Sequence, residues 1–291
     1  MNYQRWLFLL KLCVSVTLVA RGWLTWQWDS PIRGLVWHED WWSSLLEKTT
    51  DLTWTDFALA SDPWINQGLM VFGILLIVGG ILPWFISKSC CPWTRWLLWP
   101  LAGLLLIDSF ARWVSSDYEF GMAIEHALQM ITPIALFFVS GKNPAMKRWC
   151  LLVSIAAAMT FIGHGCYAAG IHPVPLSYQN MTIGILGVSQ DTALILLAVA
   201  GWLDILFAIG IFFRQTRMLS LCYLVLWGAA TAAARVVAHI DLGIDGWALN
   251  PWAFETMVRT SHWLLPLLLL LLYRFRIEPA RSEVKRITQP V

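Results

Sequence analysis

Charged residues are scarce in this chain of 291 residues. Lys, Arg, Asp and Glu make up 13% of the sequence, whereas 58% of the residues are hydrophobic. Soluble domains are roughly 25% charged and about half apolar, so a water-soluble globule of this composition would lack the polar surface to cover its core. The same composition excludes a disordered chain, which requires low hydrophobicity and high net charge. The sequence therefore predicts a membrane protein.

Cysteine is also scarce, and several chemical motifs are missing. Six cysteines are too few for a disulfide framework, and the adjacent pair Cys90-Cys91 lacks the C-x-x-C spacing of redox sites. The sequence contains no P-loop, no G-x-G-x-x-G after a strand, no serine nucleophile elbow and no H-E-x-x-H. We therefore predict no nucleotide-binding domain, no serine hydrolase and no metal site.

Long apolar runs are the dominant pattern. A bilayer core of ~30 Å requires about 20 mostly apolar residues in a helix, and backbone groups in lipid must be hydrogen-bonded within the segment. We therefore predict an all-α membrane protein with eight transmembrane helices. The first is expected to be retained rather than cleaved, because Lys11 and Arg21 interrupt its apolar run. The predicted spans are approximately residues 5–26, 65–87, 94–115, 119–139, 149–170, 190–213, 218–240 and 253–274.

Basic residues collect on one side of these spans. They precede span 1, lie between spans 2 and 3, 4 and 5, and 6 and 7, and follow span 8 in the tail 276–291, while acidic residues dominate the opposite side. Short cytoplasmic loops are enriched in Lys and Arg. We therefore predict a multi-pass protein of the bacterial plasma (inner) membrane with both termini cytoplasmic. The basic tail is attributed to orientation and anionic lipid, so no nucleic-acid partner is predicted.

Twenty tryptophans are a second unusual feature of the composition. In the predicted spans only Trp202, Trp227 and Trp263 fall near a helix centre, and the other tryptophans fall at helix ends or in loops. The amphipathic indole ring prefers the headgroup level of a bilayer. The tryptophan positions therefore favour the predicted span boundaries.

The two halves of the chain repeat several motifs in the same order. We predict a first four-helix repeat at residues 1–140, with an extended outer loop at 27–64, and a second at 149–275. Because four spans return the chain to the same side, the repeats would be parallel and related by a pseudo-twofold axis along the membrane normal. The matched motifs are Leu18-Val19-Ala20-Arg21-Gly22 with Phe161-Ile162-Gly163-His164-Gly165, Ala111-Arg112 with Ala234-Arg235, and Pro133 with Pro266 before long apolar runs.

Two outer segments are expected to fold against the spans. Pro31 follows Ser30, which is typical of a helix start, so residues 31 to about 47 are predicted to form one interfacial helix. In the second half, residues 171–190 are predicted to form a lid or re-entrant segment over the outer face. Both segments lie on the acidic side of the predicted spans.

Nine ionisable side chains are predicted to form a site. Such groups are unfavourable inside a bilayer and normally face a protein interior or a water-filled cavity. Because most of those within spans fall in the outer half, we predict an outward-facing polar chamber between the two halves. The predicted ligand-binding residues are Arg112, Glu125, His126, His164, Arg235, His239, Glu255, Arg259 and His262.

Helical spacing predicts which of these groups share a face. Glu125 and His126 are neighbours and would point about 100° apart in a continuous helix, so they are not expected to face the same centre. A purely structural role remains an alternative, because buried ion pairs and hydrogen-bonded histidines also occur away from any site. The residues four apart are Asp108 and Arg112, Arg235 and His239, and Glu255 and Arg259, the last pair extended by His262.

The segment Phe161-Ile162-Gly163-His164-Gly165, the run 198–210 and the small-residue helix around Arg235 give residues 149–275 a resemblance to the DoxX-like membrane proteins. These are four-helix proteins, some of them tied to sulfur or thiol oxidation with quinone as acceptor. The resemblance makes a quinone a candidate cofactor, while the cofactor itself stays unassigned. The first half departs from it, because Arg21-Gly22 stands in place of His164-Gly165, so a histidine-dependent reaction would be restricted to the second half.

Three functions remain open. The first is a quinone-interacting or redox-associated subunit, in which His164 with Arg235 or Arg112 donates hydrogen bonds to a quinone carbonyl and Glu125 handles protons. The second is a transporter or binder of a small anion or lipid headgroup at Arg112 and Arg235. The third is an accessory subunit embedded in the lipid bilayer, with other membrane subunits or further copies of the chain as partners. The sequence does not decide whether the chain is an enzyme.

Overall fold

The computed structural model describes residues 2–86, 93–141, 143–240, 246–275 and 277. All regular secondary structure in these ranges is helical, and eight segments are long and apolar enough to cross a membrane. The chain is thus a multi-pass, all-helical membrane protein, and this prediction is confirmed. The span bounds agree with the predicted ones to within three residues, except that the second span begins at Trp54.

The eight spans are built from eleven α-helices and a 3-10 turn of the described chain. Three spans are interrupted, each by a short break between two helices. The spans are α1 (Tyr3–Gln27), α4 with α5 (Trp54–Gly79 and Leu82–Phe85), η1 with α6 (Thr94–Leu97 and Leu98–Val114), α7 with α8 (Phe120–Glu125 and Ala127–Ser140), α9 (Met146–Ala168), α11 (Gln190–Gly210), α12 (Arg217–Val237) and α13 with α14 (Asn250–Val258 and Thr260–Phe275).

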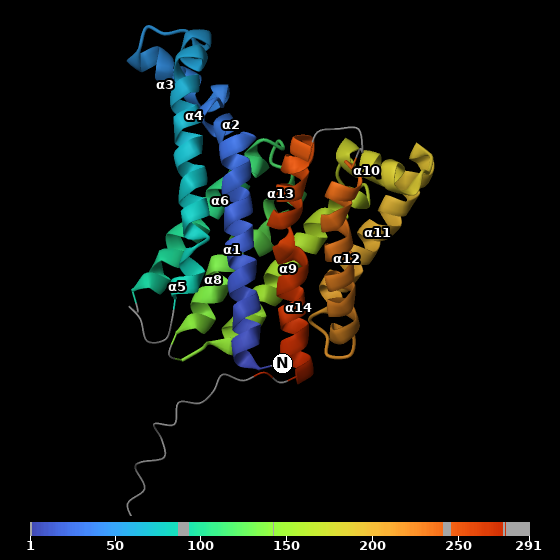
Figure 1. Cartoon of the computed structure of the whole chain (residues 1–291). Coiled ribbons are helices and arrows are strands. Elements are labelled where there is room, and N and C mark those ends of the chain that lie inside the picture. Colours follow the sequence, from blue (N-terminus) through green and yellow to red (C-terminus); the bar gives the residue numbers. More distant parts are fainter. Residues whose placement is uncertain (1, 87–92, 142, 241–245, 276, 278–291) are drawn as a thin grey trace, which may run out of the picture.

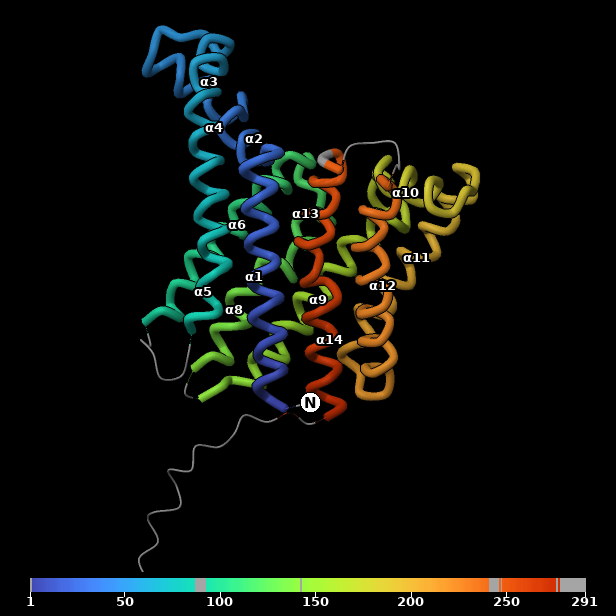
Figure 2. Tube along the Cα trace, in the orientation of Figure 1, coloured from blue at the N-terminus to red at the C-terminus, as the bar shows by residue number. Residues whose placement is uncertain are grey.

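The spans pack side by side in one bundle, and the start of α1 and the end of α14 lie at the same end of it (Figure 1). We call this the terminal end and the opposite one the far end. The spans α1, α7–α8, α9 and α13–α14 are half buried or more, whereas less than half of each of the other four is buried. Helices α4 and α11 accordingly lie at the two sides of the view in Figure 2. The core of the bundle is therefore formed by the first and fourth spans of each half.

Contacts between the two halves are reciprocal. Helix α1 packs on α13 and α14, and helix α9 packs on α7 and α8. The first span of each half thus lies against the fourth span of the other half. Within each half, the first span instead packs most extensively on the second, which pairs α1 with α4 and α9 with α11.

Glycine pairs bring the first and second spans of each half into close contact. A Cβ added to Gly73 of α4 would lie 2.6 Å from the carbonyl oxygen of Gly22 in α1, and one added to Gly201 of α11 would lie 2.7 Å from that of Gly165 in α9. Small residues at helix crossings allow backbones in a membrane to approach closely. Each crossing therefore requires glycine on both helices.

The fourth span of each half is interrupted at one residue. His126 (φ −95°, ψ 5°) separates α7 from α8, and Arg259 (φ −79°, ψ 4°) separates α13 from α14. A proline follows inside the next helix in both cases, at Pro133 and Pro266. Proline cannot donate a backbone hydrogen bond and bends a helix. The break and the proline together turn polar side chains of these spans toward the bundle interior.

The outer segment of the first half differs from the predicted single helix. It forms two helices, α2 (Ile32–Val36) and α3 (Glu39–Thr49), and the long helix α4 then begins at an N-cap on Thr53, whose hydroxyl accepts a hydrogen bond from the Asp56 amide at 3.2 Å. Together with the first turns of α4 they project beyond the far end of the bundle (Figure 1). A helix N-cap at Thr53 explains why the second span starts before its apolar run.

The segment after α9 folds back over the far end as α10 (Leu176–Leu186). It ends at Gly187, whose positive φ of 65° is a conformation that favours glycine. A 3-10 turn, η2 (Gly246–Leu249), precedes α13. The predicted segment over residues 171–190 therefore contains one short helix, and it packs on α11 and α12.

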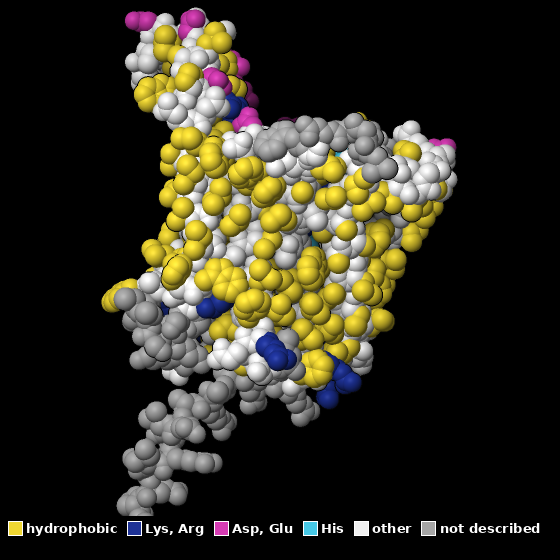
Figure 3. All heavy atoms as spheres, in the orientation of Figure 1, with side chains coloured by type: hydrophobic (Ala, Val, Ile, Leu, Met, Phe, Trp, Pro, Cys, Tyr) yellow, Lys and Arg dark blue, Asp and Glu magenta, His cyan; other side chains and the backbone are white. Residues whose placement is uncertain are grey.

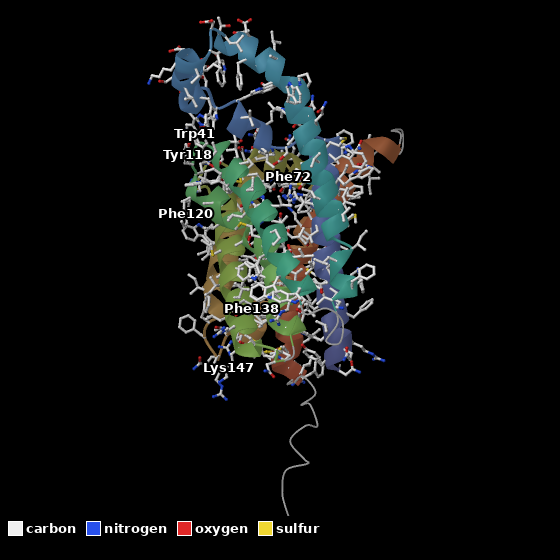
Figure 4. All side chains as sticks on the ribbon, turned by 90° about the vertical axis from the view of Figure 1, so that its left-hand side faces the viewer. Trp41, Phe72, Tyr118, Phe120, Phe138 and Lys147 are labelled. Atoms are coloured by element: carbon white, nitrogen blue, oxygen red, sulfur yellow. The ribbon has the colours of Figure 1, made fainter. Side chains whose placement is uncertain are left out.

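The surface of the bundle is divided into zones. Hydrophobic side chains cover its flank, basic side chains gather at the terminal end, and acidic ones gather on the projection (Figure 3). Lys147 extends from the terminal end, and Trp41 lies toward the opposite end (Figure 4). Two tryptophans near helix ends do not face the membrane interface. Trp6 and Trp149 are fully buried and pack edge to face, with ring centroids 4.8 Å apart. The predicted cytoplasmic features at Cys90-Cys91 and in the tail 278–291 lie outside the described residues.

The glycine crossings lead to a test on a single helix. Replacing Gly73 by Val places a side chain against the α1 backbone, so we expect the free energy of unfolding to fall by about 1–3 kcal/mol or more. Gly68 lies on the same helix with no atom within 4 Å of an added Cβ, so Gly68→Val should stay close to wild type. Thermal unfolding of the detergent-purified variants measures both, and equal melting temperatures would contradict the close crossing.

Candidate functional site

A network of polar side chains occupies the bundle interior toward the far end. Its centre is Arg21 of α1, whose side chain is 1% exposed. The Nη2 of Arg21 donates to Gln129 Oε1 at 2.8 Å, and its Nε lies 3.3 Å from Asp108 Oδ2. Arg21 therefore joins α1 to the third and fourth spans of the first half.

Asp108 binds two arginines with one carboxylate. Its Oδ2 lies 3.0 Å from the Nε of Arg112, one turn along α6, and its Oδ1 accepts a hydrogen bond from Ser30 Oγ at 3.4 Å. Spacing placed Asp108 and Arg112 on one face of a helix, and in the structure the two side chains form an ion pair. Arg21 of α1 contacts the same carboxylate, so the pair of Asp108 with Arg112 is part of a larger network.

The network continues into the second half through Gln129. Its Nε2 lies 3.2 Å from His262 Nε2, and the His262 ring lies 5.3 Å from the ring of His164 between centroids. These residues belong to α8, α14 and α9. Polar contacts thus run without interruption from the first half of the chain to the second.

His164 lies between a carboxylate and a phenol. Its Nδ1 is 3.3 Å from Glu125 Oε2 and 3.0 Å from the hydroxyl of Tyr178 in α10. Burial raises the pKa of Tyr178 above its ordinary value of 10.0, so the hydroxyl stays protonated at neutral pH and can donate a hydrogen bond. Which partner receives the imidazole proton depends on the tautomer.

The prediction that Glu125 and His126 point apart is wrong. Both side chains are buried, and Glu125 Oε1 lies 3.5 Å from His126 Nδ1. The 100° separation holds only in a continuous helix, whereas the chain leaves helical geometry at His126. The break allows both groups to reach the interior.

The two other predicted pairs with four-residue spacing differ in their contacts. Glu255 and Arg259 form the expected ion pair. Arg235 and His239 do not pair through their side chains, because Arg235 Nη1 donates to the Thr231 carbonyl at 3.1 Å while the His239 ring stacks on Trp252 with centroids 3.5 Å apart. His239 is therefore engaged in packing at the end of α12.

A cavity of about 520 Å³ adjoins this network in the second half, between α9, α10, α11, α12 and α14. Its volume is in the range of small-molecule sites. Most of its wall is apolar, and polar groups are confined to a few positions. Four predicted site residues line it, namely His164, Arg235, Arg259 and His262, and further polar lining groups are Tyr178, Thr182, Asp204 and Thr231.

The other five predicted residues lie outside the cavity lining. Glu125 contacts both His164 and His126, and Arg112 belongs to the ion network of the first half. Glu255 pairs with Arg259, and His239 packs on an indole ring. The structure therefore brings together most of the predicted groups in a buried network, with the cavity on the side of the second half.

The predicted site left out five residues of this region, namely Arg21, Asp108, Gln129, Tyr178 and Asp204. Arg21, Asp108 and Asp204 could have been found, because each is an ionisable residue within an apolar span. Gln129 is a polar side chain in a span, which is a weaker signal. Tyr178 had no signal in the sequence, because its position depends on how α10 folds back onto α9.

The third spans of the two halves differ at one polar position. Arg112 has Asp108 one turn before it, whereas Arg235 has Thr231 one turn before it. Among the described residues, no carboxylate lies within 4 Å of the Arg235 guanidinium. Arg235 thus faces the cavity with donors that are available to a ligand.

No group of three or more His, Cys, Asp or Glu side chains within the described ranges is arranged to hold a metal ion. Comparison with protein-family models, with curated proteins and with solved structures found no match. The resemblance to the DoxX-like proteins therefore rests on the short motifs of residues 149–275 alone and stays a prediction.

The shared carboxylate leads to a second test. Asp108→Asn leaves the buried guanidinium group of Arg21 and the partly buried one of Arg112 without their shared carboxylate, so we expect the free energy of unfolding to fall by about 3–5 kcal/mol. Asp62 pairs with Arg33 on the projection, where its side chain is 46% exposed, so the matched change Asp62→Asn should cost less than about 1 kcal/mol. Denaturant titration in detergent measures both. Similar losses in the two variants would contradict a dependence on buried charge.

Proposed function

We propose that the protein binds a lipid-soluble molecule with an oxygen-bearing head group in the cavity of the second half. The observation that carries this proposal is the composition of the cavity wall. Apolar side chains form most of it, and the donors Arg235 and Tyr178 lie with the imidazole of His164 among the few polar lining groups. Ligand sites commonly combine an apolar wall with a few placed polar groups.

The ligand enters from the bilayer. The cavity lining includes Leu196 of α11, 42% exposed, and Val237 of α12, 51% exposed, so the cavity reaches the lipid-facing flank of two outer spans. Hydrophobic side chains also cover the visible flank of the bundle (Figure 3). An apolar molecule dissolved in the membrane can therefore reach the polar groups without crossing water.

A quinone is the ligand class that we favour, in the role of a quinone-interacting or redox-associated membrane protein. A quinone carries carbonyl acceptors on an apolar ring, which matches donors at Arg235 and Tyr178 within an apolar wall. His164 can exchange a proton with Glu125, which lies 3.3 Å from it. The resemblance of residues 149–275 to the DoxX-like proteins supports the same class.

A small anion or a lipid headgroup is the second candidate. It is favoured by one observation, the lack of a described carboxylate partner for Arg235, whereas Arg112 shares Asp108 with Arg21. A guanidinium group binds carboxylate and phosphate groups well. In this case only the second half would provide the site, because the arginines of the first half are already paired. A third role, as an accessory subunit or a homo-oligomer, stays a prediction.

The two halves are proposed to be parallel repeats, residues 1–140 and 149–275. The glycine crossings of Gly22 with Gly73 and of Gly165 with Gly201 support this relation, since each joins the first and second spans of one half. The reciprocal packing of first on fourth spans also supports it. A pseudo-twofold axis along the membrane normal accounts for both features.

The interrupted fourth spans support the same relation. His126 stands seven residues before Pro133, and Arg259 stands seven residues before Pro266. The break and the proline thus recur at the same spacing in both halves. Independent helices would not be expected to share this pattern.

The protein is proposed to lie in the plasma (inner) membrane with both termini cytoplasmic. The terminal end carries the basic side chains visible in Figure 3, and the projection at the far end carries acidic ones. Basic residues are retained on the cytoplasmic side of membrane proteins. The cavity would then open in the outer leaflet.

Binding of a decyl-substituted benzoquinone to the purified protein tests the function. Arg235→Gln removes a charged donor, so we expect the dissociation constant to rise roughly 10- to 100-fold. The matched control is Arg217→Gln on the same helix, because Arg217 donates to the Ile211 carbonyl and does not line the cavity. Isothermal titration in detergent should give wild-type affinity for the control. Wild-type protein that binds no quinone would refute the quinone assignment.

The anion candidate is tested separately by thermal unfolding with inorganic phosphate and with short-chain phosphatidylglycerol. If an anion is the ligand, either probe should raise the melting temperature of wild type and not that of Arg235→Gln. Stabilisation by phosphatidylglycerol alone would indicate that the ligand is a lipid headgroup. Stabilisation by both probes would indicate that the ligand is a free anion. The quinone assignment predicts a shift with the benzoquinone and none with phosphate.

A further inference from the structure

Asp204 is a carboxylate inside a membrane span that faces the cavity. It lies on α11, is 4% exposed and belongs to the cavity lining. Its Oδ1 accepts a hydrogen bond from the hydroxyl of Tyr223 at 2.9 Å. Among the described residues no Lys, Arg or His lies within 4 Å of it. An ionisable group without a counter-ion in a span is costly and marks a functional position.

The contact between α9 and α11 does not itself require an acid. A Cβ on Gly165 would meet Ile205 and the Cβ of Asp204, while a Cβ on Gly22 would meet Ile77 and the Cβ of Leu76. The same helix crossing is thus made with leucine in the first half. The carboxylate of Asp204 is thus not needed for the crossing of α9 with α11, and it lines the cavity, where one of its oxygens also contacts Tyr223 of α12.

The cavity consequently has two kinds of polar group. Arg235 and Tyr178 offer donors, and Asp204 offers an acceptor that already receives the Tyr223 hydroxyl. A ligand that fills the cavity meets both kinds, and it gains most where it forms a hydrogen bond with each of them. One oxygen of such a ligand accepts a hydrogen bond, and another donates one.

We propose that Asp204 is a ligand-binding residue that accepts a hydrogen bond from a hydroxyl group, so that the cavity prefers a quinol over the corresponding quinone. The proposal rests on the proposed function. A quinol carries two hydroxyls, each of which can donate and accept, so it satisfies both Asp204 and Arg235. A quinone carries only acceptors, and its second carbonyl would face the carboxylate oxygen.

The experiment compares one ligand in two redox forms. The probes are the decyl-substituted benzoquinone and its hydroquinone, titrated anaerobically into the purified full-length protein. In wild type we expect the hydroquinone to bind about tenfold tighter, the effect of one additional hydrogen bond. Asp204→Leu, which installs the residue found at Leu76, should reduce hydroquinone affinity until the two forms differ by less than about threefold.

Two further variants separate binding from structure. Asp204→Asn keeps the side-chain volume and adds an amide donor, so it should bind the quinone at least as well as wild type does. Tyr223→Phe keeps the carboxylate and should retain the preference for the hydroquinone. The melting temperature of each variant, measured without ligand, identifies those that are folded.

Several outcomes would overturn the proposal. Equal affinity of wild type for the two forms would remove the assigned role of Asp204 and leave quinone binding intact. Loss of both forms in Asp204→Leu and Asp204→Asn, or loss of the preference in Tyr223→Phe, would reduce Asp204 to a group that positions Tyr223. Failure of wild type to bind either form would refute the proposed function itself.

Discussion

The carboxylate of Asp108 lies between two guanidinium groups inside the bundle, and the rest of the polar network depends on it. Arg21 and Arg112 reach it from different helices, α1 and α6. A guanidinium group removed from water is stable only when it is paired, so this carboxylate allows α1 to carry an arginine at a buried position. Arg21 then holds Gln129, which contacts His262 and links the first half to the cavity.

The proposed repeats use the same helix crossings for different purposes. In the first half the carboxylate of Asp108 pairs with both Arg21 and Arg112. In the second half Thr231 takes the corresponding place beside Arg235, and Asp204 stands where the crossing of the first half has Leu76. Charged side chains thus lie in an ion network in the first half and in the wall of a cavity in the second half.

Local spacing identified two side-chain pairs that form within one span, whereas Arg235 and His239 at the same spacing do not pair through their side chains. Asp108 with Arg112 and Glu255 with Arg259 follow from four-residue separation. Arg21 with Asp108 could not be predicted, because the partners are distant in sequence and meet only when the helices assemble into the bundle. The contact of Glu125 with His126 was mispredicted for a related reason, since spacing assumes a continuous helix and the chain breaks between α7 and α8.

The sequence by itself determined that this is an eight-span helical membrane protein, because insertion into a bilayer depends on the apolar composition of each segment. Only the tertiary structure decided which ionisable groups are paired and which face a cavity. The reason is that a site depends on which helices are neighbours, and small residues such as Gly165 and Gly201 set those neighbours by close packing. The position of α10, which brings Tyr178 to His164, was likewise decided by the fold of the whole chain.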